Sequence, residues 1–192
     1  MNYERLRIPD VVLFTPKRID DTRGFFSETF RQDAFDAAVG PSTFVQDNHS
    51  YSEDAGIIRG LHFQRPPHAQ GKLVRVVRGA ILDVAVDIRV GSPTYGQHVT
   101  AMLSVQNWQQ LWVPVGFAHG YCTLAPKTEV IYKTSNYYSP ADDLGLAFND
   151  PALAIEWPVV ADAARISDRD RHHPRLEELQ QCFRFGEPTM QF

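Results

Sequence analysis

Polar residues that are costly to bury lie inside strand-like stretches of the chain, and they are densest between residues 46 and 72. A second group lies in the segment 114–120. Residues such as His62, Lys72 and Arg59, if they face an apolar interior, could support three chemistries: metal binding, proton abstraction next to a carbonyl, or binding of a phosphorylated ligand. Each chemistry requires different neighbouring residues.

Metal binding is not favoured by the spacing. A metal site in a β-barrel usually has two or three histidines and a carboxylate, often with His-x-His on one strand so that both imidazoles share a face. Here the residue two positions after His62 is Gln64. His68 could replace it only from a loop that follows two prolines, and there is no glutamate between His68 and Lys72. The sequence therefore predicts that no metal is bound.

The residues needed for proton abstraction next to a carbonyl are present. The reaction needs a neutral base, a cation or donor for the enolate oxygen, and an acid on the opposite face. His62 is the candidate base, Lys72 the candidate group for the oxygen, and Tyr132 the candidate acid on a different strand. A carboxylate bonded to the second imidazole nitrogen would fix the tautomer of the base, and the spacing alone does not choose among several Asp residues.

A phosphorylated ligand is compatible with the same site. Arg23 and Arg59 could bind phosphate groups by bidentate contacts, and Tyr138 could stack on a base. Strict alternation along a strand places Arg59 and His62 on opposite faces. One shared site therefore requires a bulge or bend at Gly60.

The elements that must position these residues are mainly strands. Thirteen prolines and twelve glycines divide the chain into segments of strand length. The stretch 80–89 alternates as a half-buried antiparallel strand would. Further strands are predicted at 11–19, 24–30, 43–51, 73–77, 98–104, 110–113, 119–124 and 128–135, and helices only at 32–39 and 174–182. Many short strands at this spacing indicate a sandwich or barrel.

Composition limits the class of protein. The 192 residues suit a single domain over 1–192, and a content of 43% hydrophobic and 22% charged residues is globular. A net charge of -4 and the lack of a long apolar run argue against nucleic acid or a membrane as a partner. Cys122 and Cys182 form no disulfide or zinc pattern, and the N-terminus lacks a secretory signal, so we expect a cytoplasmic protein with buried thiols.

Several motifs follow one another in order from about Phe14 to Asp170. They are Asp-Thr-Arg-Gly-Phe-Phe-Ser-Glu at 21–28, Gln-Asp-Asn at 46–48, Arg-Gly-Leu-His-Phe-Gln at 59–64 with Pro66-Pro67, Gln-Gly-Lys-Leu-Val at 70–74, Asp-Val-Ala-Val-Asp-Ile-Arg at 83–89, Ser-Pro-Thr-Tyr-Gly at 92–96 and Pro-Val-Gly-Phe-Ala-His-Gly at 114–120. In this order they resemble the dTDP-4-dehydrorhamnose 3,5-epimerase family, which consists of cofactor-free, cupin-like sugar-nucleotide epimerases.

The resemblance implies a fold and a reaction. The implied fold is mainly β, a double-stranded β-helix or jelly roll with short peripheral helices, in which the segment 151–192 packs on a core of roughly 11–150 and supplies an aspartate to the site. The implied assembly is a homodimer in which the N-terminal segment of each subunit contributes to the partner's site. The implied reaction inverts C3 and C5 of dTDP-4-dehydro-6-deoxy-α-D-glucose and yields dTDP-4-dehydro-β-L-rhamnose, in dTDP-L-rhamnose biosynthesis.

The resemblance also implies roles for particular residues. The base matches His62, its carboxylate partner Asp170, the acid Tyr132, and the group that steadies the enolate oxygen Lys72. Nucleotide or sugar contacts match Arg23, Glu28, Gln46, Asn48, Arg59 and His119, and the thymine-stacking aromatic matches Tyr138. No cofactor is implied, because the ketone of the substrate stores the charge of the intermediate.

Two positions depart from the family pattern, and two alternative functions stay open. Asp143 stands where Glu is common, and Arg169 stands where Lys is common before the dyad Asp. Both are predicted to contact substrate, although each substitution changes geometry while it preserves charge. The alternatives are a mono-epimerase, acting at C3 or C5 only on a related dTDP-4-ketosugar in an antibiotic-sugar pathway, and a non-catalytic cupin-like sugar-nucleotide-binding module. Tyr132 favours double inversion, because an acid is available.

Overall fold

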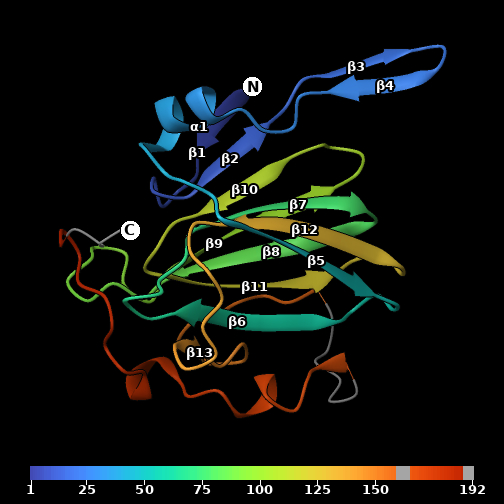
Figure 1. Cartoon of the computed structure of the whole chain (residues 1–192). Helices are drawn as coiled ribbons and strands as arrows, with labels where there is room; N and C mark the ends of the chain where they lie inside the picture. Colours follow the sequence, from blue (N-terminus) through green and yellow to red (C-terminus); the bar gives the residue numbers. More distant parts are fainter. Residues whose placement is uncertain (159–164, 188–192) are drawn as a thin grey trace.

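The computed structural model describes residues 1–158 and 165–187, and its main body consists of two antiparallel sheets that face each other (Figure 1). The six-stranded sheet has the order β1-β2-β10-β7-β12-β5, and the five-stranded sheet has the order β13-β6-β11-β8-β9. The strands of the first sheet are β1 (Asn2–Arg5), β2 (Val12–Thr15), β5 (Gln46–Ser52), β7 (Lys72–Arg78), β10 (Gln110–Val113) and β12 (Thr128–Thr134). Those of the second are β6 (Ile58–Gln64), β8 (Ala80–Asp87), β9 (His98–Ser104), β11 (Phe117–Thr123) and β13 (Asp143–Gly145). From β5 to β13 the chain passes repeatedly from one sheet to the other, as in a jelly roll.

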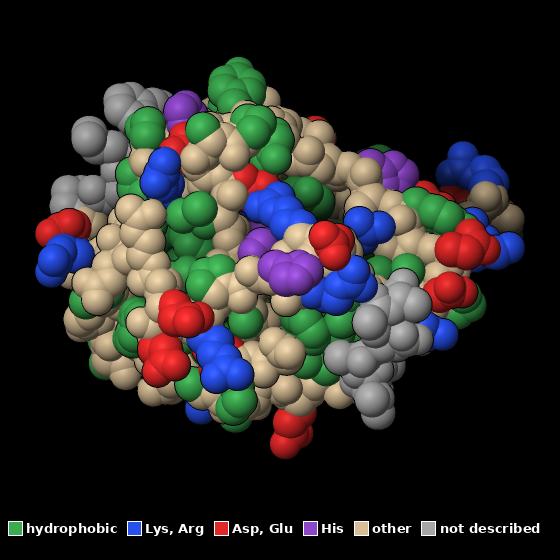
Figure 2. All heavy atoms as spheres, turned by 90° about the horizontal axis from the view of Figure 1, so that it is seen from below, with side chains coloured by type: hydrophobic (Ala, Val, Ile, Leu, Met, Phe, Trp, Pro, Cys, Tyr) green, Lys and Arg blue, Asp and Glu red, His purple; other side chains and the backbone are tan. Residues whose placement is uncertain are grey.

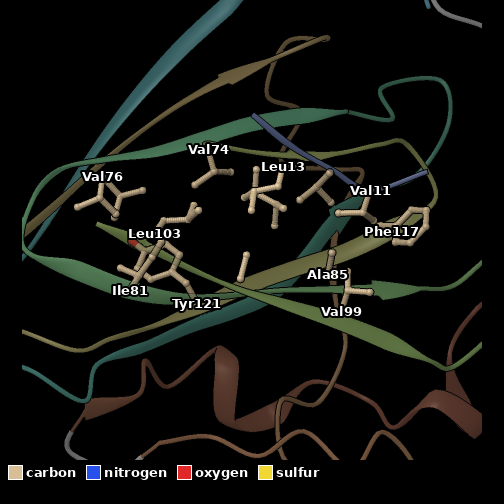
Figure 3. Packing of buried hydrophobic residues seen from close by; sticks show 14 of the residues in the cluster. Val11, Leu13, Val74, Val76, Ile81, Ala85, Val99, Leu103, Phe117 and Tyr121 are labelled. Carbon is tan, nitrogen blue, oxygen red and sulfur yellow. The ribbon is translucent and has the colours of Figure 1, made fainter. Parts of the chain in front are cut away.

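An apolar core fills much of the space between the two sheets (Figure 3). Val74 and Val76 of β7 lie on one side of this space, and Ile81 and Leu103 lie on the other side, on β8 and β9. All four side chains are buried. Because side chains of a strand alternate between its faces, every second residue of these strands points into the core.

Strand β8 is buried on both faces, so the prediction of a half-buried strand is wrong. Ile81 faces the core between the sheets, whereas Val84 and Val86 belong to a second apolar cluster with Leu153 and Phe183. The chain after β13 runs along the outer side of the five-stranded sheet (Figure 1). This C-terminal covering removes from solvent the face that an isolated sheet would expose.

The strand predicted at 11–19 is two strands separated by a proline. Strand β2 ends at Thr15, and Pro16 offers no N–H group to extend the ladder. The chain then forms a hairpin of β3 (Arg18–Asp21) and β4 (Gly24–Ser27), which we call the hairpin arm, and this arm projects from the body (Figure 1). The helix α1 (Gln32–Val39) follows and confirms the predicted helix at 32–39.

The predicted elements differ from the structure at three further places. The sequence pattern misses β1, β6 and β13, of which β13 is short and β6 is irregular. The helix predicted at 174–182 is only a 3-10 turn, Leu176–Glu178, because Leu179 has an extended backbone with φ -68° and ψ 129°. Cys122 is buried, but Cys182 is only partly buried, so the expectation of two buried thiols is wrong for the second.

The C-terminal segment 151–192 packs on the sheets where it is described, and its residues 159–164 and 188–192 lie outside the described part. Within the described ranges, no helix is long and apolar enough to cross a membrane. A single domain over the whole chain stays a prediction.

Candidate active site

One end of the space between the sheets is polar. The inward-facing row of β7 runs from Val76 and Val74 to Lys72, and that of β12 runs from Val130 to Tyr132. Lys72 and Tyr132, together with side chains from the facing sheet and the C-terminal segment, surround a cavity of about 510 Å³, a volume typical of ligand pockets. The predicted site residues that line it are Arg59, His62, Lys72, His119, Tyr132, Arg169 and Asp170.

A β-bulge in β6 brings Arg59 and His62 to the same cavity. His62 pairs with His119 of β11. Arg59 pairs with Tyr121, so β6 has one more residue than β11 between the two pairs. Gly60 adopts φ 107° there, and a Cβ atom would lie 2.7 Å from the carbonyl oxygen of His119, so the position requires glycine. The predicted irregularity at Gly60 is confirmed.

The carboxylate beside His62 comes from the C-terminal segment. Asp170 Oδ1 lies 2.7 Å from His62 Nε2, and Asp170 Oδ2 accepts a hydrogen bond from the N–H of Gly60 at 3.0 Å. A parallel bridge between Ile58 and Ile166 ties the segment to β6, and both isoleucines are buried in one apolar cluster. Asp170 is therefore held in place with only 4% of its surface exposed.

Burial and hydrogen bonding set the charges of this pair. Burial lowers the pKa of His62 below its usual value, although the hydrogen bond to Asp170 opposes the shift. Burial disfavours ionisation of Asp170, but the imidazoles of His173 and His62 beside it outweigh burial and hold the pKa of this carboxyl well below its usual range. At neutral pH the pair is a neutral imidazole and a carboxylate. Because a carboxylate only accepts hydrogen bonds, we assign the proton of His62 to Nε2, which leaves a lone pair on Nδ1.

Lys72 and Tyr132 lie on the sheet opposite His62. Burial lowers the pKa of Lys72 to about 8, so its ammonium group is mostly protonated at neutral pH. The Nζ atom of Lys72 donates a hydrogen bond to the carbonyl oxygen of His62 at 3.4 Å. Burial raises the pKa of Tyr132, which keeps its phenol protonated. The cavity thus holds a neutral base on one sheet, with a cation and an un-ionised acid on the other.

A second histidine and carboxylate pair lies in the cavity wall. His119 Nε2 lies 2.7 Å from Asp83 Oδ1, and both residues are buried. The other oxygen of Asp83 has no hydrogen-bond partner among the described residues. This bond fixes the orientation of the His119 ring, which lines the cavity.

The other predicted ligand contacts of the main body form a hydrogen-bonded chain that starts at Arg169, which lines the cavity, and that we call the rim. Asp143 Oδ2 accepts hydrogen bonds from Arg169 Nη1 at 2.7 Å and from the hydroxyl of Tyr138 at 3.1 Å. Gln46 accepts the backbone N–H of Tyr138 at 3.0 Å and donates to Asn48 Oδ1 at 2.9 Å. Tyr138 itself is 54% exposed, which leaves its ring open to a stacking partner. The two residues that depart from the family pattern, Asp143 and Arg169, therefore contact each other.

Arg23 and Glu28 are not brought to the cavity of their own chain. Arg23 lies on the hairpin arm, where it pairs with Asp21 at 2.6 Å and where 88% of its side chain is exposed. Glu28 follows the arm and is also exposed. These two are the predicted site residues that the fold of one chain leaves apart.

One group of described residues has the atoms to be considered for a metal. Potential ligand atoms of His62, Asp170 and His173 lie within 4.8 Å of one another. The 2.7 Å distance from His62 to Asp170 is that of a hydrogen bond, whereas two ligands of a tetrahedral zinc would be about 3.3 Å apart. Gln64 is buried and donates to the carbonyl oxygens of His68 and Tyr137. The geometry favours a hydrogen-bonded pair, and the absence of a bound metal stays a prediction.

Several residues of the site were not predicted, among them Tyr121 and Arg165, which line the cavity, and His173, which lies beside Asp170. Tyr121 follows His119 by two positions on β11, and its hydroxyl lies 2.8 Å from Ser50 Oγ at the cavity. Alternation along the strand was therefore a usable signal. His173 lies 3.3 Å from Asp170, and no local pattern separates it from its exposed neighbour His172. On the face seen in Figure 2, histidine side chains lie near the centre among Lys and Arg side chains.

A jelly roll with a buried histidine and aspartate pair, a lysine and a tyrosine around one cavity defines a cupin-like protein suited to acid–base chemistry. Residues 5–178 match the family described as dTDP-4-dehydrorhamnose 3,5-epimerase. The chain belongs to this family, which confirms the resemblance seen in the motifs and the prediction of an isomerase.

Individual relatives agree with this assignment. The chain is 52% identical over 171 residues to the dTDP-4-dehydrorhamnose 3,5-epimerase of Shigella flexneri, and the aligned region covers 88% of this chain and 93% of that protein. It is similar to the crystal structure of dTDP-6-deoxy-D-glucose-3,5-epimerase from Legionella pneumophila in complex with dTDP-4-keto-L-rhamnose, with a TM-score of 0.91, 39% identity and coverage of 97% and 99%. It is also similar to a 3'-monoepimerase from Streptomyces bikiniensis in complex with dTDP-quinovose, with a TM-score of 0.83, 32% identity and coverage of 90% and 87%. These likenesses confirm the predicted cupin-like jelly roll.

Proposed function

We propose that this chain epimerises dTDP-4-dehydro-6-deoxy-α-D-glucose at C3 and C5 to dTDP-4-dehydro-β-L-rhamnose, in dTDP-L-rhamnose biosynthesis. The observation that carries the proposal is the placement of His62, bonded to Asp170, across one cavity from Lys72 and Tyr132. The activities named for the relatives support the same substrate. Each inverted carbon loses one proton and regains one, so the reaction balances without an oxidant or a reductant.

In the proposed reaction His62 is the base. The C4 ketone acidifies the protons on C3 and C5, because the enolate that forms places its charge on oxygen. Nδ1 of His62 accepts the proton, and Asp170 stabilises the resulting imidazolium through the 2.7 Å contact with Nε2. The bulge at Gly60 is what turns His62 toward the cavity.

Lys72 and Tyr132 complete the proposed reaction. The ammonium group of Lys72 stabilises the enolate oxygen, and partial burial of this side chain strengthens the interaction of its charge with that oxygen. Inversion requires that the new proton arrive on the opposite face of the sugar ring. Tyr132 can deliver it, because its protonated phenol lies on β12, across the cavity from β6.

The remaining predicted residues are proposed to hold the nucleotide and the sugar. Arg59 and Arg169 at the cavity supply positive charge for the two phosphates. Tyr138 at the rim offers an exposed ring for thymine, and Asp143 bonds both that tyrosine and Arg169. Polar contacts to the sugar or nucleotide are assigned to Gln46, Asn48 and His119.

We propose a homodimer in which the hairpin arm reaches the partner's cavity. The arm projects from the body (Figure 1) and leaves Phe25 and Phe26 54% and 69% exposed. Neighbouring aromatic rings with this exposure favour burial against a second surface. A two-fold symmetric exchange of arms would bring Arg23 and Glu28 to both cavities. The free thiols of Cys122 and Cys182 support a location in the reducing cytoplasm.

Incubation with the ketosugar in D2O, followed by NMR of the recovered sugar, tests the reaction. We expect deuterium at both C3 and C5. Label at one carbon only would identify a mono-epimerase, the alternative favoured by the likeness to the Streptomyces bikiniensis enzyme. Binding of dTDP without any label would identify the non-catalytic binding module.

The proposed reaction needs no metal and no other cofactor, because the ketone and the fixed donors around it stabilise the intermediate. Dialysis against a chelator should leave the rate of epimerisation unchanged. A loss of rate that is restored by adding a metal ion would contradict this proposal.

A further inference from the structure

Asp170 faces two imidazoles. Its Oδ1 lies 2.7 Å from His62 Nε2 and 3.3 Å from His173 Nε2. The two rings are nearly perpendicular, with centroids 5.5 Å apart and an interplanar angle of 87°. One carboxylate oxygen is therefore shared between the proposed base and a second histidine that the proposed reaction does not use.

His173 is held firmly in this position. Only 8% of its side chain is exposed, and its buried Nε2, 3.3 Å from Asp170 Oδ1, makes no hydrogen bond of good geometry among the described residues. Its ring packs against Gly145 of β13, where a Cβ atom would overlap the imidazole. The next residue, Pro174, accepts a backbone hydrogen bond from Ala147 at 2.8 Å. A buried polar atom fixed this way is costly unless it has a partner, and the group it faces is Asp170.

We propose that His173 is a positioning residue of this active site, which shares the carboxylate of Asp170 with His62 and thereby limits how strongly Asp170 holds a proton on His62. This inference rests on the proposed role of His62 as the base. An N–H of His173 at 3.3 Å from Oδ1 draws negative charge from this oxygen, so less remains to stabilise an imidazolium at His62. The direction is the same if His173 is charged, because two like charges at one carboxylate repel.

The function of this arrangement is to keep the base neutral. A base that is already protonated cannot accept a proton from carbon, and a carboxylate paired with a single histidine would favour the protonated form. The pKa of Asp170, held well below its usual range by His173 and His62, agrees with this arrangement. Sharing Asp170 thus extends the working range of His62 toward lower pH.

Charged groups on neighbouring strands and on the C-terminal segment also act on His62 and Asp170. Lys72 of β7 lowers the pKa of His62, and Asp143 of β13 raises it, after the larger effects of burial and of Asp170. The remaining charged or titratable groups at the cavity are Arg59, His119, Tyr121, Tyr132, Arg165 and Arg169. None of these groups changes in the test below, so a shift in the titration of His62 is assigned to His173.

Two variants of similar size separate positioning from packing. His173→Leu fills the space without a donor, whereas His173→Gln keeps an N–H that can reach Asp170. His172→Leu is the control, because the side chain of His172 is 73% exposed and its Nδ1 lies 2.7 Å from the carbonyl oxygen of Asp168. The measurement is the pH profile of deuterium exchange into the ketosugar, together with an NMR titration of the His62 ring.

We expect the acid limb of the profile and the titration midpoint of His62 to rise by about one pH unit in His173→Leu. In His173→Gln both values should lie close to those of the wild type, and in His172→Leu they should be the same as in the wild type. An unchanged titration of His62 in His173→Leu overturns the proposal, even if the rate falls. Equal shifts in the Leu and Gln variants would also overturn it, because packing alone would then explain the effect.

A measurement on the wild-type protein tests the same inference without a variant, and it stays valid if His173→Leu does not fold. If the two histidines share Asp170, their NMR titrations are coupled and neither follows a single-site curve. Two independent single-site curves would overturn the inference. A wrong assignment of His62 as the base can be distinguished from a wrong assignment of His173. It would appear as retained deuterium exchange in His62→Ala, whereas the titrations of the two rings would still report whether they share Asp170.

Discussion

The imidazole of His62 and the carboxylate of Asp170 are separated by 108 residues along the chain and by 2.7 Å in space. Strand β6 supplies the histidine, and a segment that returns along the outer side of the five-stranded sheet supplies the aspartate. The bridge between Ile58 and Ile166 fixes the position of this segment along β6. The proposed base is thus assembled only when the C-terminal covering has docked.

Replacement of His62 tests the base directly. In His62→Ala we expect deuterium exchange at both C3 and C5 to fall by roughly 10²–10⁴-fold, because proton transfer at carbon loses its acceptor. The affinity for dTDP, measured by calorimetry, should be unchanged, since the proposed nucleotide contacts lie elsewhere. His172→Ala serves as an exposed control. Exchange near the wild-type rate in His62→Ala would refute the assignment.

Replacement of Tyr132 separates removal of the proton from its return. Tyr132→Phe deletes only the hydroxyl, so the base can still abstract a proton while return on the opposite face is impaired. Turnover to product should therefore fall more than exchange of deuterium into substrate, as measured by NMR of both sugars. Tyr95→Phe, on a partly exposed ring outside the cavity, is the control. Equal loss of turnover and exchange would contradict this division of roles.

The alkaline side of the pH profile should follow Lys72. Burial lowers the pKa of Lys72 to about 8. As the pH rises through this value the ammonium group loses its proton and its charge, so stabilisation of the enolate oxygen is lost and kcat/KM falls above about pH 8. In Lys72→Arg the guanidinium stays charged, so the alkaline limb should disappear from this range even if the absolute rate is lower. An alkaline limb at the same pH in that variant would show that another group is titrating.

Gly60→Ala should damage both the fold and the site. The positive φ of 107° and the 2.7 Å approach to the carbonyl oxygen of His119 together predict a loss of about 2–4 kcal/mol in the free energy of unfolding. Gly91 has a φ of 83° but nothing within 4 Å of a built Cβ, so Gly91→Ala reports backbone strain alone, about 1–2 kcal/mol. Urea denaturation measures both, and exchange activity should fall only in Gly60→Ala. Equal loss of stability and activity in the two variants would contradict a special role for the bulge.

Mixing of inactive subunits tests the shared site. Arg23→Ala removes a residue of the hairpin arm, and His62→Ala removes the base, so each homodimer lacks activity for a different reason. If the arm acts in the partner's cavity, a mixed dimer contains one cavity with both residues intact. Co-refolding should then restore about one quarter of the wild-type activity, because half of the dimers are mixed and each has one complete site. No recovery in a mixture shown to contain mixed dimers would place Arg23 and His62 in the same subunit's site or in none.

Much of the structure follows from local patterns in the sequence. Alternation and turn residues predict most strands and the helix at 32–39, because these signals depend on neighbours within a few positions. The choice of His62, Lys72 and Tyr132 as a reactive group also needed only residue chemistry and the expectation of an apolar interior. The family motifs added Asp170, which no spacing in the sequence could select from the other aspartates.

The tertiary structure decided what depends on contacts between distant segments. The bulge in β6 arises where Gly60 meets β11. Strand alternation alone therefore predicted Arg59 and His62 on opposite faces, although both line one cavity. The C-terminal segment buries the second face of β8 and forms only a 3-10 turn at Leu176–Glu178 where a helix was predicted, since docking on the sheet outweighs local helix preference. The contact between His173 and Asp170 has the same origin. Residue types and local order are encoded along the chain, whereas burial, register and shared hydrogen-bond partners exist only after the sheets have packed.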